Sequence, residues 1–297
     1  TRFFLSVNCL LIANLFSAFA EEVTVVYPDV KPPYDVIFNK INLGITKEFN
    51  GDITLIKVPA KFSPTSVAKQ IKTDKVIALG QRGMVVAKEI YQLKPVVVGA
   101  LPIQPNGISG VSLMASPDIL FSSLNQLAPK VKKVTVLYTQ ASAWIIDVAK
   151  EKAERFGLDL VSISVDDIKS AVMTYNDIFE QEKPEENAIW LPLDPVTAND
   201  RVIVPAILKK AWENKMVVFS SKPTHAKRGA LFSAIPNNEM LGKQLATLVN
   251  TFDYKKRPST VAPLDEIKLA VNLRTAAHLG YKYDTKEKSK FALTFPN

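Results

Sequence analysis

The sequence predicts an α/β protein built of two doubly wound lobes, and three observations lead to this fold class. Short runs of β-branched residues alternate with stretches of helical spacing. The runs are apolar throughout, which is typical of parallel strands covered by helices on both faces. The alternation restarts near the middle of the chain, so two units of about 100 residues each follow one another, as two domains would. A length of 297 residues, 47% of them hydrophobic, suits this arrangement.

The first unit contains four expected strands with helices between them. The strands fall at 23–27, 53–58, 76–80 and 95–100, and the helices at 36–49, 64–71 and 84–91. The first strand reads VTVVY and the third VIALG, both apolar along their length. Runs of this kind indicate the interior of a parallel sheet.

The second unit repeats the pattern, and the last part of the chain adds four more elements. Expected strands are 133–138, 158–165, 188–191 and 216–220, and expected helices are 117–127, 142–156, 168–181 and 202–214. The remainder holds strands at 230–233 and 267–271 and helices at 237–252 and 274–279. We expect it to return the chain to the first lobe and then to the second, which creates several crossings between the lobes.

The first twenty residues have the pattern of a cleavable signal peptide. Arg2 is followed by an uncharged, mostly apolar stretch over 3–16, and Ala18-Phe19-Ala20 fits the small-x-small cleavage rule. A single anchoring helix is the alternative, but the apolar run is short for a membrane span. Cys9 is the only cysteine and lacks a lipoprotein context. We therefore expect a soluble periplasmic protein without disulfide or lipid anchor.

The charge does not indicate a nucleic-acid partner. The formal net charge is +8, yet the basic residues are spread along the chain, and the clusters at 130–133 and 255–257 flank predicted elements. No basic motif interleaved with aromatic residues accompanies them. At most, the charge favours an anionic ligand or surface.

Motifs for cofactors, metals and catalysis are missing from the sequence. The first strand runs into a proline-rich turn at 28–33 rather than a GxGxxG loop, and no GxxxxGK[ST] loop occurs. His225 and His278 are the only histidines and lie far apart. Ser109 lacks the G-x-S-x-G elbow between strand and helix. We expect no cofactor, no metal and no catalytic residue, and hence a protein that is not an enzyme.

Candidate ligand-binding residues follow the carboxyl ends of the expected strands, where open α/β sheets bind their ligands. The loops there carry opposite charges, and two of them open helices, whose free N–H groups attract anions. Together they suit a zwitterion such as an amino acid. Each residue alone has a structural alternative in capping or turn chemistry, and the aromatic members in core packing. The candidates are Tyr27, Asp29, Gln81, Arg82, Tyr138, Ser142, Asp194 and Ser221.

Several segments resemble one known family. They are GISGVSLM at 107–114, PKVKKVTVLY at 129–138, WLPLDPVTAN at 190–199, VVFSSKPTHAKRGALF at 217–232, LGKQ at 241–244 and AVNLRTA at 270–276. The chain resembles the ABC transporter substrate-binding family, whose best-known members bind aromatic amino acids such as tryptophan. The resemblance covers nearly all of the chain after the signal segment and is strongest in its second half.

The resemblance implies a type I periplasmic-binding fold: two Rossmann-like lobes joined by a three-segment hinge, with crossings near 112–117, 233–236 and 263–267. Lobe 1 would comprise 21–113 and 234–263, and lobe 2 would comprise 114–233 and 264–297. Asp194 matches the family's acidic position after the Leu-Pro strand end. The loop at 80–83 reads Gly-Gln-Arg-Gly where the family commonly has Gly-Thr-Pro-Ala, so this edge lacks the small hydroxyl residue and gains Arg82.

The expected function is capture of a small molecule, an amino acid or a related carboxylated solute, in the cleft between the lobes. The resemblance implies delivery to the permease subunits of an ABC importer, and we expect the protein to act as a monomer. Two alternatives remain open: a periplasmic sensor of the same fold that signals to a membrane receptor, and an enzyme on the same scaffold.

Overall fold

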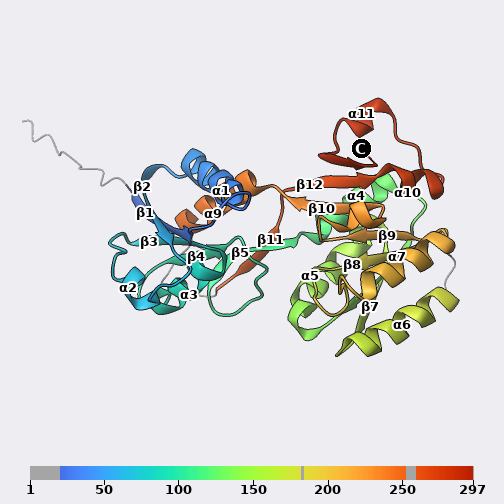
Figure 1. The fold of residues 1–297 in the computed structure, drawn as a ribbon, viewed down its shortest axis with the longest axis horizontal. Helices are drawn as coiled ribbons and strands as arrows, with labels where there is room; N and C mark the ends of the chain where they lie inside the picture. Colours follow the sequence, from blue (N-terminus) through green and yellow to red (C-terminus); the bar gives the residue numbers. More distant parts are fainter. Residues whose placement is uncertain (1–20, 182–183, 252–258, 297) are drawn as a thin grey trace, which may run out of the picture.

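A computed structural model describes residues 21–181, 184–251 and 259–296, which form two separate β-sheets flanked by helices (Figure 1). The predicted signal peptide over 1–20, with Cys9, lies outside the described residues. Within the described ranges, no helix combines the length and apolar character needed to span a bilayer. The α/β class with two mostly parallel sheets is confirmed.

The first sheet has six strands in the order β11-β5-β4-β3-β1-β2, and every pairing in it is parallel. Central strand β1 lies between β2 and β3, and its side chains from Val23 to Pro28 are buried. A strand whose side chains are buried on both faces of the sheet is apolar along its length. The strands are β1 (Glu21–Pro28), β2 (Gly51–Val58), β3 (Lys75–Leu79), β4 (Val96–Gly99), β5 (Ser109–Ala115) and β11 (Val261–Leu264).

Four helices cover this sheet, and we call the sheet with them lobe 1. Val25 packs in the cluster formed with α1 (Asp35–Glu48) and α9 (Asn238–Thr251). Its neighbour Val26 points to the opposite face, beneath α2 (Pro64–Ala68) and α3 (Gly80–Ile90). Two glycines let α1 and α9 touch, because a Cβ at Gly44 or Gly242 would overlap a backbone carbonyl of the other helix.

The second sheet has seven strands in the order β13-β12-β10-β9-β8-β6-β7. All its pairings are parallel except that of β10 with β12, which is antiparallel. The strands are β6 (Lys133–Tyr138), β7 (Asp159–Ser164), β8 (Asn187–Leu191), β9 (Val217–Ser220), β10 (Phe232–Pro236), β12 (Ile267–Asn272) and β13 (Leu293–Phe295).

Helices cover both faces of the second sheet, and together they form lobe 2. One buried cluster joins the sheet to α4 (Pro117–Leu127), α5 (Ala143–Ala153) and α10 (Leu273–His278), and another joins it to α6 (Ile168–Gln181) and α7 (Ile203–Glu213). Buried rings of Trp190, Phe219 and Phe232 stack across three adjacent strands, at centroid distances of 6.2 and 5.2 Å. Shorter helical pieces are η1 (Gln140–Ser142), η2 (Glu154–Phe156), α8 (His225–Arg228) and α11 (Thr285–Lys288).

The chain passes between the lobes three times (Figure 1). The crossings lie between β5 and α4, between β10 and α9, and between β11 and β12. This is the three-segment hinge expected for the fold. The exact residues at which one lobe ends and the other begins stay a prediction, because sheet membership assigns the strands and not the connections.

The structure differs from the expected elements at several points. Strands β5, β11 and β13 were not expected, because β11 and β13 are short and β5 and β11 carry Gly, Ser or Pro, residues that weaken a strand pattern. The helix expected at 84–91 begins at Gly80, whose φ of 66° is readily adopted by glycine and turns the chain directly from β3 into α3. Gln81 and Arg82 therefore lie in the first helical turn, not in a loop.

Candidate ligand-binding cleft

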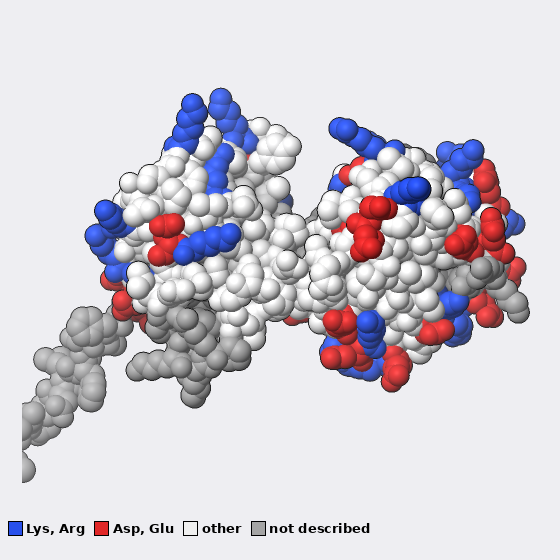
Figure 2. Space-filling model, turned by 90° about the horizontal axis from the view of Figure 1, so that it is seen from below, with Lys and Arg blue, Asp and Glu red and all other residues white. Residues whose placement is uncertain are grey.

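A cavity of about 550 Å³ lies where the two lobes face each other. Lobe 1 contributes Pro102, from the segment after β4, and lobe 2 contributes the segment after β8 together with Lys222. In the space-filling view the two lobes are separate masses joined by a narrow waist, and charged side chains concentrate away from it (Figure 2). The lobe 2 residues are Pro192, Leu193, Asp194, Pro195, Ala198, Asn199, Asp200, Arg201 and Lys222.

Parallel pairing explains why this edge of lobe 2 collects polar residues. Strand β8 pairs with β6 on one side and with β9 on the other, with Leu191 opposite Ser220 at the ends of β8 and β9. The segments that leave these strands therefore emerge side by side, which is the general place for a ligand in an open α/β sheet. Four of the predicted residues, Tyr138, Ser142, Asp194 and Ser221, lie on these segments.

Asp194 is the centre of a dense hydrogen-bond network. Its Oδ2 accepts from Ser142 Oγ at 2.6 Å, from Thr139 Oγ1 at 2.7 Å and from the Thr139 N–H at 3.0 Å. Its Oδ1 accepts from the N–H groups of Val196 and Thr197 at 2.9 and 3.0 Å. Burial disfavours its charged form, but the hydrogen bonds from Ser142, Thr139 and Thr197 outweigh it and lower the pKa. Asp194 thus ties the β6 loop to the β8 loop.

Ser142 and Tyr138 border this network. Ser142 is the N-cap residue of α5, is buried, and directs its hydroxyl to Asp194, so it makes no side-chain cap to its own helix. The first backbone N–H group of α5, that of Ala143, donates instead to the Gln140 carbonyl in η1. Tyr138 is half-buried, and the Lys150 ammonium lies 6.0 Å from its ring centroid.

Ser221 is occupied by a core contact. Its hydroxyl accepts a hydrogen bond from the Trp190 indole N–H at 2.9 Å, and its backbone N–H donates to the Leu191 carbonyl at 3.0 Å. Both side chains are buried. The contact satisfies the indole N–H of a large core residue, a donor that is costly to leave unpaired.

A second network, around Asp200, was not found from the sequence. Its carboxylate accepts from Lys222 Nζ, from Arg228 Nη1 at 2.9 Å and contacts His225 Nε2 at 3.0 Å. The Lys222 hydrogen bond is the main cause of the lowered pKa of Asp200. Burial lowers the pKa of His225, against the opposing effect of Asp200, so its imidazole is neutral at pH 7.

Ser220, His225 and Asp200 form a chain of contacts that resembles a catalytic triad. Ser220 Oγ lies 2.7 Å from His225 Nδ1, and His225 Nε2 lies 3.0 Å from Asp200. Ser220 and His225 are both fully buried, and Ser220 Oγ also contacts the Leu191 carbonyl and accepts from the Lys222 N–H. A nucleophile must reach its substrate, so this chain of contacts is structural.

In lobe 1 the predicted residues lie at the same kind of edge. Arg82 Nη1 donates to the carbonyls of Asp29 and Val58, each at 2.8 Å, and so ties the ends of β1 and β2 to α3. Gln81 and Asp29 are exposed. Tyr27 is buried in the core, with its ring 6.3 Å from that of Phe38, as the packing alternative expected.

Of the eight predicted residues, only Asp194 lines the cavity. Ser142 contacts Asp194 directly, whereas none of the four lobe 1 residues borders this cavity. Four other residues that line the cavity were not predicted from the sequence: Pro102, Asp200, Arg201 and Lys222. Of these, Lys222 directly follows the predicted residue Ser221 in the segment after β9. Among the described residues there is no group of three His, Cys, Asp or Glu side chains arranged to hold a metal ion.

One comparison with known proteins identifies a family, and another shows the fold. A family model described as ABC transporter substrate binding protein matches residues 68–288. An ABC domain from Streptococcus pneumonia, solved in complex with L-Trp, is 18% identical with a TM-score of 0.55; the match covers 93% of this chain and 100% of that one. The ligand-free, open structure of a substrate binding protein with adhesive properties from Clostridium difficile is 20% identical with a TM-score of 0.62, at the same coverage. At these identities the likeness shows the fold alone. No curated protein matches the sequence.

Proposed function

The chain belongs to the ABC transporter substrate-binding protein family, and on that premise we propose that it captures a small carboxylated solute, an amino acid or a close relative, in the interlobe cleft. The family implies a small-molecule ligand and an ABC permease as partner. The observation that carries the proposal is the cavity between the lobes, lined by groups of both charges at the carboxyl ends of parallel strands. Its volume of about 550 Å³ fits a small metabolite.

The charges around the cavity support a zwitterionic solute. Arg201 can attract a carboxylate. Lys222 and Asp200 pair with each other, but the Asp200 side chain, whose exposed fraction is 41%, keeps an open side that can attract an ammonium group. Asp194 uses its carboxylate on protein donors, so we assign it the positioning of the loop that forms the cavity wall. Charge complementarity of this kind selects the class of ligand more than it raises affinity.

Lobe 1 can supply the second half of the site when the cleft closes. Helix α3 begins at the end of β3 without a side-chain cap, so its first N–H groups are open to an anion. Arg82 in that turn uses Nη1 on two carbonyls, and its remaining N–H groups can face a carboxylate. Ligand contacts with both lobes then stabilise the closed state, which the permease recognises.

The remaining parts of the proposal follow from the family and the sequence. Members of this family are usually extracytoplasmic, and the signal-like segment over 1–20 supports export to the periplasm. Binding and release require no covalent step, so we infer a monomeric carrier without catalytic activity, cofactor or nucleic-acid partner.

A thermal-shift screen tests this function directly. We expect one class among amino acids, dicarboxylates and neutral sugars to raise the unfolding temperature in a concentration-dependent way, equivalent to about 2.7 kcal/mol of added stability at 100 times the Kd. Sugars of similar size serve as the uncharged control. If neutral sugars alone stabilise the protein, the carboxylated-solute assignment is wrong; if every class fails at millimolar concentration, a small-metabolite carrier is contradicted.

A further inference from the structure

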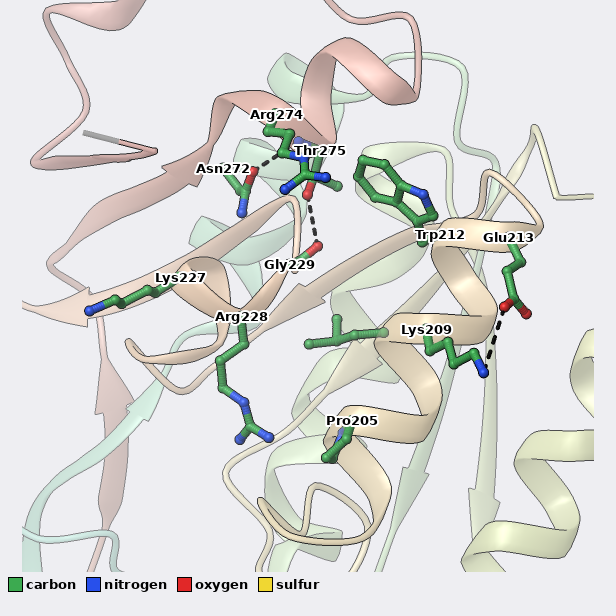
Figure 3. A pocket seen from close by; sticks show the side chains of 11 residues that line it. Pro205, Lys209, Trp212, Glu213, Lys227, Arg228, Gly229, Asn272, Arg274 and Thr275 are labelled. Atoms are coloured by element: carbon green, nitrogen blue, oxygen red, sulfur yellow. Dashed lines mark hydrogen bonds and ion pairs between the residues drawn. The ribbon is translucent and has the colours of Figure 1, made fainter.

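A second recess lies on the flank of lobe 2, outside the cleft, and we call it the flank groove (Figure 3). Its main cavity, about 630 Å³, runs between α7, α8 and the start of α10. An adjoining cavity of about 360 Å³ shares Lys227, Asn272 and Arg274 with it and extends to Phe295 and Pro296. The flank groove and the cleft cavity have no lining residue in common.

The flank groove has an excess of positive charge. Three elements bring four cations to its main cavity, against one carboxylate, Glu213, whose oxygen lies 4.0 Å from Lys209. The cations are Lys209, Lys227, Arg228 and Arg274. The adjoining cavity adds no acidic residue. Like charges that share a recess repel one another, and a bound anion relieves that repulsion.

Among the residues that the structure describes, two of these cations have no carboxylate partner. Arg228 is bound to Asp200, through its side chain at 2.9 Å and its carbonyl at 2.7 Å. Within the described ranges, no ion pair joins Lys227 or Arg274 to an acid, and these two line both cavities. An incoming anion would therefore meet Lys227 and Arg274 first.

The Arg274 guanidinium is held against an aromatic stack. Its central carbon lies 5.3 Å from the Trp212 ring centroid, and Trp212 stacks on His278 at 3.7 Å with 4° between the ring planes. His278 Nε2 contacts the Trp212 carbonyl at 2.8 Å, which fixes the stack. A guanidinium placed over an aromatic ring still has N–H groups that can donate hydrogen bonds to an oxyanion.

The wall between the two cations is rigid. Buried Asn272 donates to the Ala226 carbonyl at 2.8 Å and accepts from the Thr275 N–H at 2.8 Å. Thr275 Oγ1 donates to the Gly229 carbonyl at 3.0 Å (Figure 3). These bonds join α8, which carries Lys227, to α10, which carries Arg274, so the backbone positions from which the two side chains extend are fixed before a ligand arrives.

We propose that the flank groove binds a small multivalent oxyanion, with Arg274 and Lys227 as its principal ligands. The chemistry is that of a phosphate or polycarboxylate solute: Arg supplies paired donors and Lys a mobile point charge. The concave shape and a volume within the usual range of ligand pockets favour a free solute over a membrane surface, which would need an open basic face.

Equilibrium dialysis of the full chain against inorganic pyrophosphate, at constant ionic strength, tests the proposal. We expect saturable binding of one pyrophosphate per chain and at least a tenfold weaker affinity in the double variant Lys227→Gln/Arg274→Gln. The matched control is Lys130→Gln/Lys132→Gln, which removes the same charge from exposed positions of the same lobe outside the groove. Its affinity should stay within twofold of the parent.

Three outcomes would overturn the proposal: no saturable binding up to millimolar pyrophosphate, an equal loss in both double variants, or loss of binding in Arg82→Ala, which would place the anion in the cleft. Thermal unfolding of each variant shows whether it is folded. If the groove variant unfolds early, the single variant Lys227→Gln replaces it, because the Lys227 side chain is exposed and makes no hydrogen bond or ion pair within the described residues.

Discussion

The two lobes differ in the side chains that join their strand-end segments at the edges that face the cleft. In lobe 2, Asp194 and Asp200 tie three strand-end segments together through nine contacts to protein groups. In lobe 1, the Arg82 side chain makes the corresponding tie, to two backbone carbonyls. The cores differ as well, since lobe 2 stacks three aromatic rings across its sheet while the core of lobe 1 is mainly aliphatic.

The difference indicates that the two lobes contribute to ligand binding in different ways. A ligand site needs a pre-organised part, and lobe 2 supplies it because the buried Asp194 and the partly exposed Asp200 fix its loops before any ligand arrives. Lobe 1 leaves the first turn of α3 uncapped and most of the Arg82 guanidinium unused, so its groups remain open to a ligand. Substitution of Asp194 in lobe 2 should therefore affect mainly stability, and substitution of Arg82 in lobe 1 should affect mainly binding.

The largest effect is expected for Asp194→Ala in lobe 2. The variant leaves buried donors of Ser142 and Thr197 without their acceptor, and we expect the free energy of unfolding to fall by about 3 kcal/mol. Urea denaturation measures this loss. Asp147→Ala is the control, because its side chain is 70% exposed and pairs only with Lys150 on the surface, so it should cost under about 0.5 kcal/mol. Equal losses would contradict a structural role for Asp194.

Arg82→Ala should show the opposite pattern, with the main effect on binding. We expect the affinity for the solute identified by thermal shift to fall at least tenfold, about 1.4 kcal/mol, because the carboxylate loses its lobe 1 partner. Calorimetric titration measures the affinity. The control, Arg155→Ala, removes an arginine that pairs with Asp118 at 3.4 Å on the outside of lobe 2, and it should bind normally. An unchanged affinity in Arg82→Ala would remove this residue from the site.

Much of the fold could be predicted from the sequence because its signals are local. Apolar strands such as 23–27 and helices of regular spacing such as 142–156 follow from hydrophobic pattern alone. Strands β5, β11 and β13 could not be found in this way. Their sequences, SGVSLMA, VAPL and LTF, become strands because neighbouring strands offer them hydrogen-bond partners in the folded chain.

The candidate site was predictable only where position within an element was enough. Asp194 follows a strand end directly, so the carboxyl-end rule found it. Asp200 lies in the middle of the β8–α7 connection, and its partners Lys222, His225 and Arg228 come 22, 25 and 28 residues later. No spacing rule links them, because α8 is brought over the sheet edge by the fold. Likewise, the sequence did not predict that Ser221 contacts Trp190 and that Tyr27 packs near Phe38, because these contacts depend on the packing of the folded core.

Ser221→Ala separates the two roles that this residue could have. If its hydroxyl serves mainly the Trp190 indole, the variant leaves a buried N–H unpaired and lowers the free energy of unfolding by about 1 kcal/mol, with solute affinity unchanged. Urea denaturation and calorimetric titration of the same samples give both quantities. Ser164→Ala, at the exposed end of β7, is the control and should alter neither. A loss of affinity without a loss of stability would instead make Ser221 a ligand contact.

The smallest effect concerns pH and again belongs to lobe 2. Burial lowers the pKa of His225, so the unfolded chain takes up a proton near pH 6.5, about the ordinary value, before the folded chain does. The contribution of neutral His225 to the free energy of unfolding is fully present above that pH, and it is lost as the pH falls through the folded-state pKa. Nearby Lys222 and Arg228 act in the same direction as burial, and Asp200 opposes them. We expect the parent protein to lose under about 1 kcal/mol of stability between about pH 6.5 and 5 through this residue. Urea denaturation across that range should show the slope in the parent and in His278→Gln but not in His225→Gln, and a slope that persists in His225→Gln would assign it to other groups.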